Sequence, residues 1–426
     1  MRLKTAIISM VGGLVGAMLL ANQAMARRQI IEPADIPESG MYVEEFARLD
    51  TAMKQLLSKW QIPGASLALV KDGQLLLSRG YGYADVETLS RVQPESLFRI
   101  ASLSKPVTAA CVLMLVQEKK LALNDRLKGL LKDWPVLSQE SKDQRIDNIT
   151  VQQLLDMSAG WDKRRSGDPV LKPVINTAAR RLGLSPPADF QATARFVLGR
   201  RLDFQPGESF SYCNFGYGLL GRIIEQLSGQ DYDQYARCAL LEPLGIRGFA
   251  KGFTSRFDLL PGEVTYYGYP GEGKVSNIFP DEEKRVSAPY GRAYLEADTA
   301  MFGWIACASD IARFVDALVS PKRSPLNEDL RQILSARPTL PVWAGKRNYF
   351  AMGFDVEEIP GSGKVLFKDG SLPGSRAFVE QRANGLTWCC LFNCRPKWRR
   401  SDPFGKEVRQ SIDSCLNSHE SLKPKQ

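Results

Sequence analysis

Segments with the pattern of β-strands stand at both ends of this chain, and that placement constrains its fold more than any other feature. Near the start, the apolar run 65–70, the turn signal Lys71-Asp72-Gly73-Gln74 and the returning run 75–83 predict a hairpin. Near the other end, strand periodicity recurs at 351–356, 364–368, 375–380 and 386–392. We therefore expect an α/β (α+β) fold in which one antiparallel sheet is formed from both chain ends and is flanked by helices.

Helical spacing of apolar residues fills much of the chain between these strands. An inserted, mostly helical subdomain is therefore expected beside the sheet. The clearest helices are predicted at 46–60, 102–119, 150–157, 217–227, 311–318 and 402–416. The stretch 266–294, which is rich in Gly, Pro and Tyr, is predicted to be irregular.

The first 26 residues have the pattern of a signal peptide. Arg2 and Lys4 precede an apolar run over about 6–21, and Ala24-Met25-Ala26 supplies a cleavage site. A membrane anchor is the alternative, but an anchor needs roughly 20 apolar residues. This run is shorter and contains three glycines. No later stretch is long and apolar enough to span a bilayer, so we expect an exported protein, periplasmic or secreted.

The remainder is expected to form one domain. Its composition, with 44% hydrophobic and 24% charged residues, suits a globular protein with a large core. The predicted parts are a polar lead-in at 27–45 and a single domain at 46–420, with a sheet subdomain at about 46–101 and 300–420 and a helical subdomain at about 102–299.

The net charge is moderately positive. Removing residues 1–26 takes away Arg2 and Lys4 and no acidic residue, so the formal charge falls from +9 to +7. The excess is spread along the chain, with short basic clusters at 163–165 and 397–400. Such clusters are usually solvated surface, so we expect no nucleic-acid partner.

Eight cysteines are too few in so long a chain to indicate a small disulfide-stapled scaffold. Cys394 and Cys415 are the most plausible pair, because one lies near a strand end and the other in the last predicted helix. The single histidine, His419, lies in a polar C-terminal tail, and there is no C-x-x-C motif. We therefore expect no metal site and no cofactor.

A serine and a lysine three residues apart open the predicted helix at 102–119. Side chains at i and i+3 share one helix face, so Lys105 can contact the Ser102 hydroxyl. A Ser-His-Asp triad is nearly excluded by the lack of a usable histidine, so a serine nucleophile would need another base. By itself the pattern is weak, and the alternative is an ordinary exposed helix start.

Two further segments carry polar side chains in suggestive places. After a Pro-Gly turn, Tyr212 and Asn214 are two residues apart and point the same way if the loop is extended. The alternative is a core tyrosine beside a capping asparagine. Later, Lys368 stands at a strand end before Gly370 and Ser371, where a glycine allows close approach of the backbone to a ligand. The alternative there is a surface hairpin.

Together the three segments resemble the S-x-x-K, Y-x-N and K-T-G (or H-x-G) motifs of the serine β-lactamases, D,D-peptidases and related serine esterases. The tyrosine points to the class C β-lactamase-like branch. The surrounding segments 98–101, Ser158-Ala159-Gly160 and Pro243-Leu244-Gly245 are also similar to that family. The resemblance runs from about residue 62 to 396 and implies a β-lactamase/transpeptidase-like fold.

The resemblance implies a serine hydrolase that forms an acyl-enzyme. Ser102 would be the nucleophile, and Lys105 and Tyr212 would share its proton, with the microscopic base left open. Asn214 would hold Lys105 and the substrate amide. Backbone N–H groups of Ser102 and Ser371 would form the oxyanion hole, which is worth roughly 3 kcal/mol for each donor in comparable enzymes.

The K-T-G-like segment would also contribute Lys368 and Gly370. Lys368 and Lys105 disfavour each other's charge and favour a phenolate on Tyr212. Asp369 stands where the family pattern has a hydroxyl residue. It would repel a substrate carboxylate or pair with Lys368, although Arg376 is close enough in sequence to restore positive charge. This departure favours an ester or a neutral amide as substrate.

Two other departures are expected to be structural. Met157 replaces a histidine that many relatives carry, and Cys213 should turn away from its polar neighbours and pack. The function expected is cleavage of an ester or amide in a small molecule or peptide, as by an esterase or a D,D-peptidase. A true β-lactamase is the nearest alternative, and a non-catalytic binder or sensor of cell-wall fragments is an alternative of another class.

Overall fold

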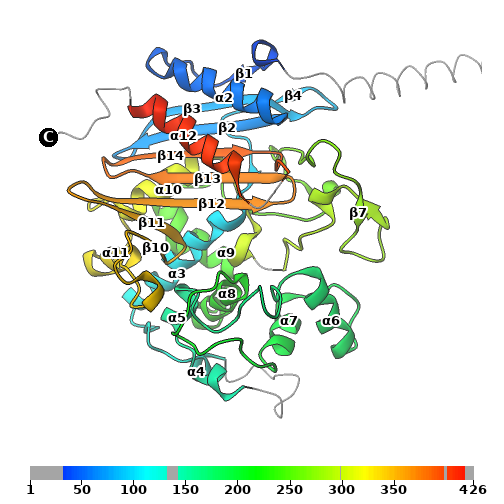
Figure 1. Ribbon diagram of the computed structural model, residues 1–426, viewed down its shortest axis with the longest axis vertical. Coiled ribbons are helices and arrows are strands. Elements are labelled where there is room, and N and C mark those ends of the chain that lie inside the picture. The colour runs from blue at the N-terminus through cyan, green and yellow to red at the C-terminus, as the bar shows by residue number, and fades with distance from the viewer. Residues whose placement is uncertain (1–31, 132–142, 298, 398–400, 418–426) are drawn as a thin grey trace, which may run out of the picture.

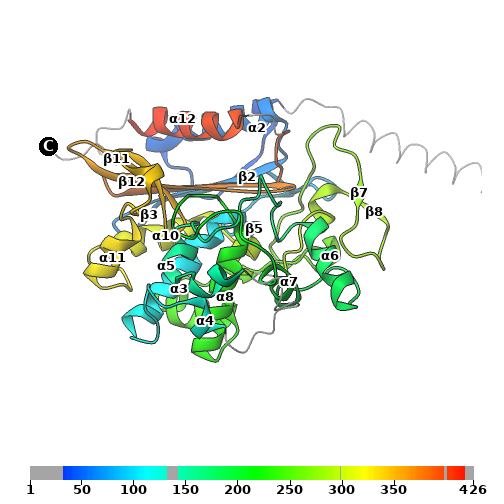
Figure 2. The same cartoon turned by 60° about the horizontal axis from the view of Figure 1, so that its bottom comes forward.

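The computed structural model describes residues 32–131, 143–297, 299–397 and 401–417. The predicted signal peptide and His419 lie outside these residues. The described chain forms three layers, which Figure 2 shows with the sheet edge-on between two helices above and a helical region below.

A nine-stranded antiparallel sheet contains strands from both ends of the chain. Its order is β1-β3-β2-β14-β13-β12-β11-β10, with β4 paired to β3. The join is β2 on β14, where Ala68 lies opposite Cys389. The strands are β1 (Glu38–Ser39), β2 (Gly64–Lys71), β3 (Gln74–Asp85), β4 (Ser90–Arg91), β10 (Asn348–Ala351), β11 (Phe354–Ile359), β12 (Gly363–Leu372), β13 (Ser375–Gln381) and β14 (Leu386–Phe392). The predicted fold class is confirmed.

One predicted strand is wrong in its bounds. The segment 351–356 is divided between β10 and β11 by a turn at Met352 and Gly353, whose φ angles are +42° and +97°. The turn packs closely on the helical region, because a Cβ on Gly353 would lie 2.8 Å from the backbone nitrogen of Pro106. Alternation alone does not distinguish a tight hairpin from one continuous strand.

Helices α2 (Ala47–Trp60) and α12 (Pro403–Asn417) cover one face of the sheet (Figure 1). The alternation of β2 explains why both faces are apolar. Ala65, Leu67 and Leu69 pack in the cluster beneath α2 and α12. The intervening Ala68 and Val70 pack in the larger cluster on the other face. A strand buried on both faces reads as a continuous apolar run, as residues 65–70 do.

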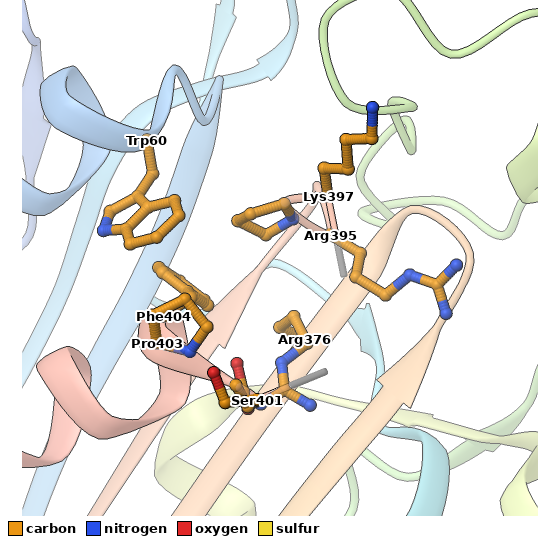
Figure 3. Close-up of a pocket in the computed structure, with 9 residues that line it drawn as sticks. Trp60, Arg376, Arg395, Lys397, Ser401, Pro403 and Phe404 are labelled. Carbon is orange, nitrogen blue, oxygen red and sulfur yellow. Dashed lines mark hydrogen bonds and ion pairs between the residues drawn. The ribbon is translucent and has the colours of Figure 1, made fainter. Parts of the chain in front are cut away.

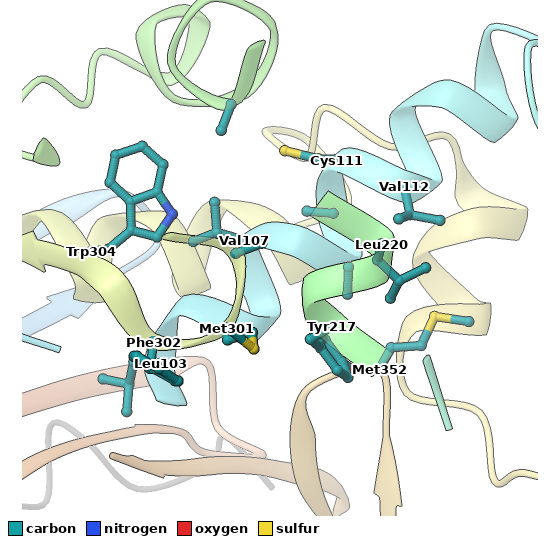
Figure 4. Packing of buried hydrophobic residues seen from close by; sticks show 14 of the residues in the cluster. Leu103, Val107, Cys111, Val112, Tyr217, Leu220, Met301, Phe302, Trp304 and Met352 are labelled. Atoms are coloured by element: carbon teal, nitrogen blue, oxygen red, sulfur yellow. The ribbon is translucent and has the colours of Figure 1, made fainter. Parts of the chain in front are cut away.

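The other face carries α10 (Ala308–Val319), which contacts β2 and β14, and beyond it α3 (Ser104–Gln117) and α8 (Asn214–Ser228). Helix α3 is buried over nearly its whole length, so it is a core helix rather than an amphipathic surface one. Val107, Cys111 and Val112 of α3 pack with Tyr217 and Leu220 of α8 (Figure 4). This packing fixes the end of α3 that faces β12.

The helical region contains several short helices that apolar spacing did not resolve one by one. They are α4 (Leu127–Leu130), α5 (Val151–Leu155), α6 (Lys172–Leu182), α7 (Phe190–Val197), α9 (Tyr232–Tyr235) and α11 (Glu328–Leu334). Local capping marks some of their starts: the Asp189 side chain accepts from Ala192 N at the start of α7. None of the helices in the described part of the chain is long and apolar enough to cross a membrane.

The predicted pairing of Cys394 with Cys415 is wrong, because both residues keep their thiols. Arg395 lines a hollow together with Pro403 and Phe404, so Cys394 lies near the first turn of α12. Cys415 lies in the last turn, roughly 20 Å away at 1.5 Å per residue. A disulfide requires Cα atoms within about 7 Å.

Candidate active site

Ser102 lies at the entry to α3. It belongs to a single 3₁₀ turn, Ala101–Leu103, that leads into the helix. The residue before it, Ala101, has a φ of +50°, which is costly for a residue with a Cβ and is often found at functional sites. Lys105 is fully buried, and its Nζ lies 3.2 Å from Ser102 Oγ. The predicted serine–lysine contact is therefore present.

Tyr212 and Asn214 reach the same pair from the loop before α8. The Tyr212 hydroxyl lies 2.8 Å from Ser102 Oγ. Lys105 Nζ donates to Asn214 Oδ1 at 2.8 Å and to the carbonyl oxygen of Met301 at 2.7 Å. With Ser102, these acceptors match the three N–H groups of an ammonium. The Ser102 hydroxyl is thus held between an amine and a phenol.

A carboxylate that the sequence did not single out holds Asn214 in place. Asp168 is buried, and its Oδ2 accepts from Asn214 Nδ2 at 2.8 Å. An amide whose NH₂ group faces a carboxylate must turn its oxygen the other way, here toward Lys105. The sequence carries no signal for this contact, because Asp168 lies in a loop 46 residues before Asn214.

Lys368, Gly370 and Ser371 lie on β12, at the edge that faces the start of α3. In the described residues, β11 pairs with β12 only as far as Phe367, so this edge of residues 368–372 is open. A Cβ on Gly370 would lie 2.4 Å from the carbonyl oxygen of Ile100. Only glycine permits that approach, which brings β12 and the following Ser371 against the turn that carries Ser102.

Lys368 is buried and faces Tyr212. Its Nζ lies 5.1 Å from the centre of the Tyr212 ring and 3.2 Å from Asp355 Oδ2. Lys105 Nζ lies 5.2 Å from the same ring centre. Two ammonium groups therefore act on one phenol.

These charges shift the pKa of each group. Burial raises the pKa of Tyr212, but the Lys105 and Lys368 ammonium groups outweigh it and bring that pKa below its usual value. Burial also lowers the pKa of Lys105. For Lys368, burial favours the neutral amine, but Tyr212 and Asp355 reverse this and raise its pKa. The arrangement favours loss of a proton from the Tyr212–Lys105 pair while Lys368 stays charged.

Asp369 does not pair with Lys368, which corrects one of the two expectations for this residue. It lies opposite Phe378 in the register, on the face covered by α2 and α12. Its Oδ2 accepts from Arg376 Nη1 at 3.0 Å. A carboxylate neutralised in this way gives little reason to expect repulsion of a substrate carboxylate.

The two other departures from the family pattern are packed. Cys213 is buried in the main core, and burial raises the pKa of its thiol. Met157 is also buried there, in a left-handed conformation with a φ of +54°. Both side chains pack in that apolar cluster, so both are interpreted as structural.

An aromatic cluster continues outward from Tyr212. Phe350 contacts Tyr212 with ring centres 6.2 Å apart, and Phe210 lies 5.5 Å from Phe350 and 5.0 Å from Trp343. Tyr212, Phe210 and Trp343 are only partly buried. Lys163 also contributes, since its Nζ lies 5.2 Å from the Tyr212 ring centre. Lys163 is exposed, as expected for the cluster 163–165, and it lies over this ring as well.

The hollow beside the first turn of α12 lies on the face of the sheet opposite to Ser102 (Figure 3). It is lined by Trp60, Arg376, Arg395, Lys397 and Phe404, among others. It contains none of the predicted site residues, and Arg376 there is paired with Asp369 and Asp402. Within the described residues, no group of three or more His, Cys, Asp and Glu side chains could hold a metal ion.

Most of the chain matches a known protein family. The profile of the family described as Beta-lactamase matches residues 49–403. "Protein flp" of Staphylococcus aureus (strain MW2) is 34% identical over 200 residues, which are 47% of this chain and 37% of that protein. "Esterase EstB" of Burkholderia gladioli is 29% identical over 222 residues, 50% of this chain and 53% of that protein. The match thus spans between about a third and a half of these relatives.

Solved structures share the fold. The octameric penicillin-binding protein homologue from Pyrococcus abyssi superimposes with a TM-score of 0.66 at 22% sequence identity, and the match covers 87% of this chain and 77% of that one. The similarity therefore extends over both the sheet and the helical region.

Proposed function

This chain belongs to the Beta-lactamase family of serine hydrolases, and from that premise we propose that it cleaves an ester or amide through an acyl-enzyme on Ser102. The observation that carries the proposal is the double contact on one hydroxyl. Ser102 Oγ lies 2.8 Å from the Tyr212 hydroxyl and 3.2 Å from Lys105 Nζ. A serine hydroxyl becomes a nucleophile when a neighbouring base takes its proton.

The proposed reaction has two halves. Ser102 Oγ attacks the substrate carbonyl carbon, and its proton passes to the coupled Tyr212–Lys105 pair. The oxyanion is bound by the N–H groups of Ser102 and Ser371, and the leaving group departs with a proton from the pair. Water then attacks the acyl-enzyme, gives its proton to the same pair, and releases the acid and free Ser102.

Lys368 and Asn214 act on that pair rather than on the proton itself. Lys368 stays charged and stabilises a phenolate on Tyr212. Asn214, oriented by Asp168, fixes Lys105 beside Ser102. Gly370 lets the β12 edge approach, so that a substrate carbonyl can lie between that edge and Ser102. The aromatic cluster of Phe210, Phe350 and Trp343 offers apolar surface for one part of the substrate.

Ester cleavage is the first activity to test, because one of the curated relatives is named an esterase. A β-lactamase remains a second outcome of the same assay. Initial rates with p-nitrophenyl esters, a D-Ala-D-Ala peptide and nitrocefin would rank the substrate classes. Fast turnover of nitrocefin with no hydrolysis of esters would replace the esterase proposal with the β-lactamase one.

The acyl-enzyme is tested by labelling with a fluorescent phosphonate. The wild type should be labelled and Ser102→Ala should not. Ser104→Ala is a matched control, because Ser104 is a buried neighbour whose Oγ faces Trp304 N, 3.4 Å away. An unlabelled wild type would overturn the enzyme proposal and favour a non-catalytic binder.

Export is part of the proposal and rests on the pattern of residues 1–26. The periplasm or the medium is the expected location. Expression of the whole chain in a bacterium, followed by N-terminal sequencing of the purified protein, tests this. We expect a mature N-terminus at Arg27, and an intact N-terminus in the cytoplasmic fraction would contradict it.

A further inference from the structure

We propose that Lys163 recognises a carboxylate on the substrate, so that the enzyme prefers esters or amides that carry an anionic group. This inference rests on the proposed function, because it assigns specificity to the same site. Its starting point is a cluster of three lysines. The Nζ atoms of Lys105, Lys163 and Lys368 all lie within 5.2 Å of the Tyr212 ring centre.

The loop that carries Lys163 is anchored next to Tyr212. Asp162 Oδ1 accepts from Ser211 Oγ at 3.1 Å, which ties the loop to the residue before Tyr212. Asp162 N donates to Asp203 Oδ2 at 2.7 Å, which ties the same loop to the segment that precedes Tyr212. These two hydrogen bonds fix the backbone next to Lys163, and the anchored loop holds its ammonium over the phenol of Tyr212.

The two arginines that follow Lys163 in the basic cluster 163–165 already have a carboxylate partner. Arg164 and Arg165 both approach Asp162, with nitrogen–oxygen distances of 3.4 and 3.9 Å. Lys163 differs from them, because among the described residues it has no carboxylate within 4.0 Å. Its ammonium lies over the ring of Tyr212, and such a contact is worth only about 0.5–1 kcal/mol at an exposed site.

The other two lysines of the cluster have acceptors of their own. Lys105 donates to Asn214 and Met301, and Lys368 contacts Asp355. Their charges therefore act on Tyr212 and the reacting atoms. Lys163 contacts the same ring but is exposed, and it forms no ion pair within the part of the chain that the structure describes. An ammonium in that position is suited to bind a carboxylate of a substrate whose carbonyl lies at Ser102.

Two matched pairs of esters test the proposal and locate the charge. The first pair differs in the acyl part: 4-nitrophenyl hydrogen glutarate and 4-nitrophenyl pentanoate. The second differs in the leaving group: the butanoate esters of 4-hydroxybenzoate and of 4-hydroxybenzamide. The measured quantity is the ratio of kcat/KM for the anionic ester to that for its neutral partner, in wild type, Lys163→Met, Lys163→Arg and Arg164→Met.

We expect Lys163→Met to lower this ratio by about two- to fivefold in at least one pair, the size of one ion pair at an exposed site. The loss should appear in KM rather than kcat, as for an interaction made equally in the ground and transition states. Lys163→Arg should largely restore the ratio. Arg164→Met, which removes the same charge from the next residue, should leave it unchanged.

Other results would overturn the inference. An unchanged ratio in both pairs would show that Lys163 does not recognise substrate charge. An equal loss with charged and neutral esters, seen in kcat, would assign Lys163 to tuning of Tyr212 instead. Failure of the proposed function is distinguishable, because then no ester would be hydrolysed and the phosphonate would not label Ser102 in any of these variants.

Discussion

The two faces of the sheet differ in how their positively charged side chains are partnered. On the face covered by α2 and α12, which we call the arginine face, two arginines are each paired with carboxylates. Arg376 pairs with Asp369 and Asp402, and Arg409 pairs with Glu357 and Glu380. On the face that carries Ser102, which we call the lysine face, three lysines gather around one tyrosine.

The difference follows from the chemistry of the two side chains. Arginine keeps its proton and its planar fork fits carboxylates, so it forms fixed ion pairs. Lysine changes its pKa readily when it is buried, so it can take part in proton transfer. Balanced charge on one face therefore indicates a structural role, and excess charge around Tyr212 indicates function. The predictions below test this contrast by asking which face affects activity and which affects stability.

The largest effect is expected on the lysine face, from Ser102→Ala. Ester hydrolysis should fall by about 10⁴-fold or more, as for loss of a nucleophile in comparable hydrolases. The free energy of unfolding should barely change, because the hydroxyl contributes only contacts to Tyr212 and Lys105. Steady-state kinetics and urea denaturation measure the two quantities. Retention of more than about a tenth of the activity would remove Ser102 from the proposed mechanism.

The next effect is expected from Tyr212→Phe. Loss of a general base costs typically 10²–10⁴-fold, and we expect kcat/KM to fall within that range. The ring and its contact with Phe350 remain, so the fold should be preserved. A full loss of phosphonate labelling at neutral pH would match the proposal. Undiminished acylation in this variant would leave Lys105 as the sole base.

Much of this site could be predicted from the sequence, because its residues come in short motifs. Ser102 and Lys105 are three residues apart and Tyr212 and Asn214 two apart, so local geometry brings each pair together. Their convergence on Lys368 was inferred from the family resemblance and not from the residues alone. The strands at both chain ends were predicted for a similar reason, since alternation and apolar runs are local signals.

The contacts that the sequence missed are those made across loops. Asp168 holds Asn214 and Lys163 lies over Tyr212 only because the segment 160–171 folds back on residues 211–214. Asp369 was expected near Lys368, but β-strand alternation places neighbours on opposite faces of the sheet. The cysteine pairing failed because proximity in a fold does not follow from position near two element ends.

On the arginine face, Arg376→Met should affect stability more than chemistry. The guanidinium is 1% exposed and its loss leaves two carboxylates without their partner. Breaking a buried ion pair costs about 3–5 kcal/mol, and the partial exposure of both carboxylates places this variant near the lower value. Urea denaturation measures the loss. Asp369→Asn/Arg376→Met/Asp402→Asn is the control, since removing all three charges together should recover much of it.

A stable Arg376→Met variant with lost activity would break the contrast between the faces. It would mean that Arg376 acts on the site through Gly370, whose carbonyl oxygen accepts from Arg376 Nη1 at 3.3 Å. The expected result is the reverse, with kcat/KM retained wherever the variant remains folded.

The smallest and most specific effects are shifts of the pH profile on the lysine face. The rising limb of kcat/KM against pH reports deprotonation of the Tyr212–Lys105 pair in the free enzyme. The Lys368 ammonium lowers the pKa of both groups. Lys368→Met removes that cation, so the pKa of the pair should rise and the limb should move to higher pH.

Asp355→Asn should move the limb the other way. The Asp355 carboxylate lies 3.2 Å from Lys368 Nζ and partly neutralises it. Without that carboxylate the Lys368 charge acts more strongly on Tyr212, which lowers the pKa of the pair and moves the limb to lower pH. This shift should be the smaller one, because the Asp355 side chain is 52% exposed and screened by solvent. Shifts of the same sign in both variants would contradict an electrostatic role for Lys368, since removing opposite charges from one ion pair must act on Tyr212 in opposite directions.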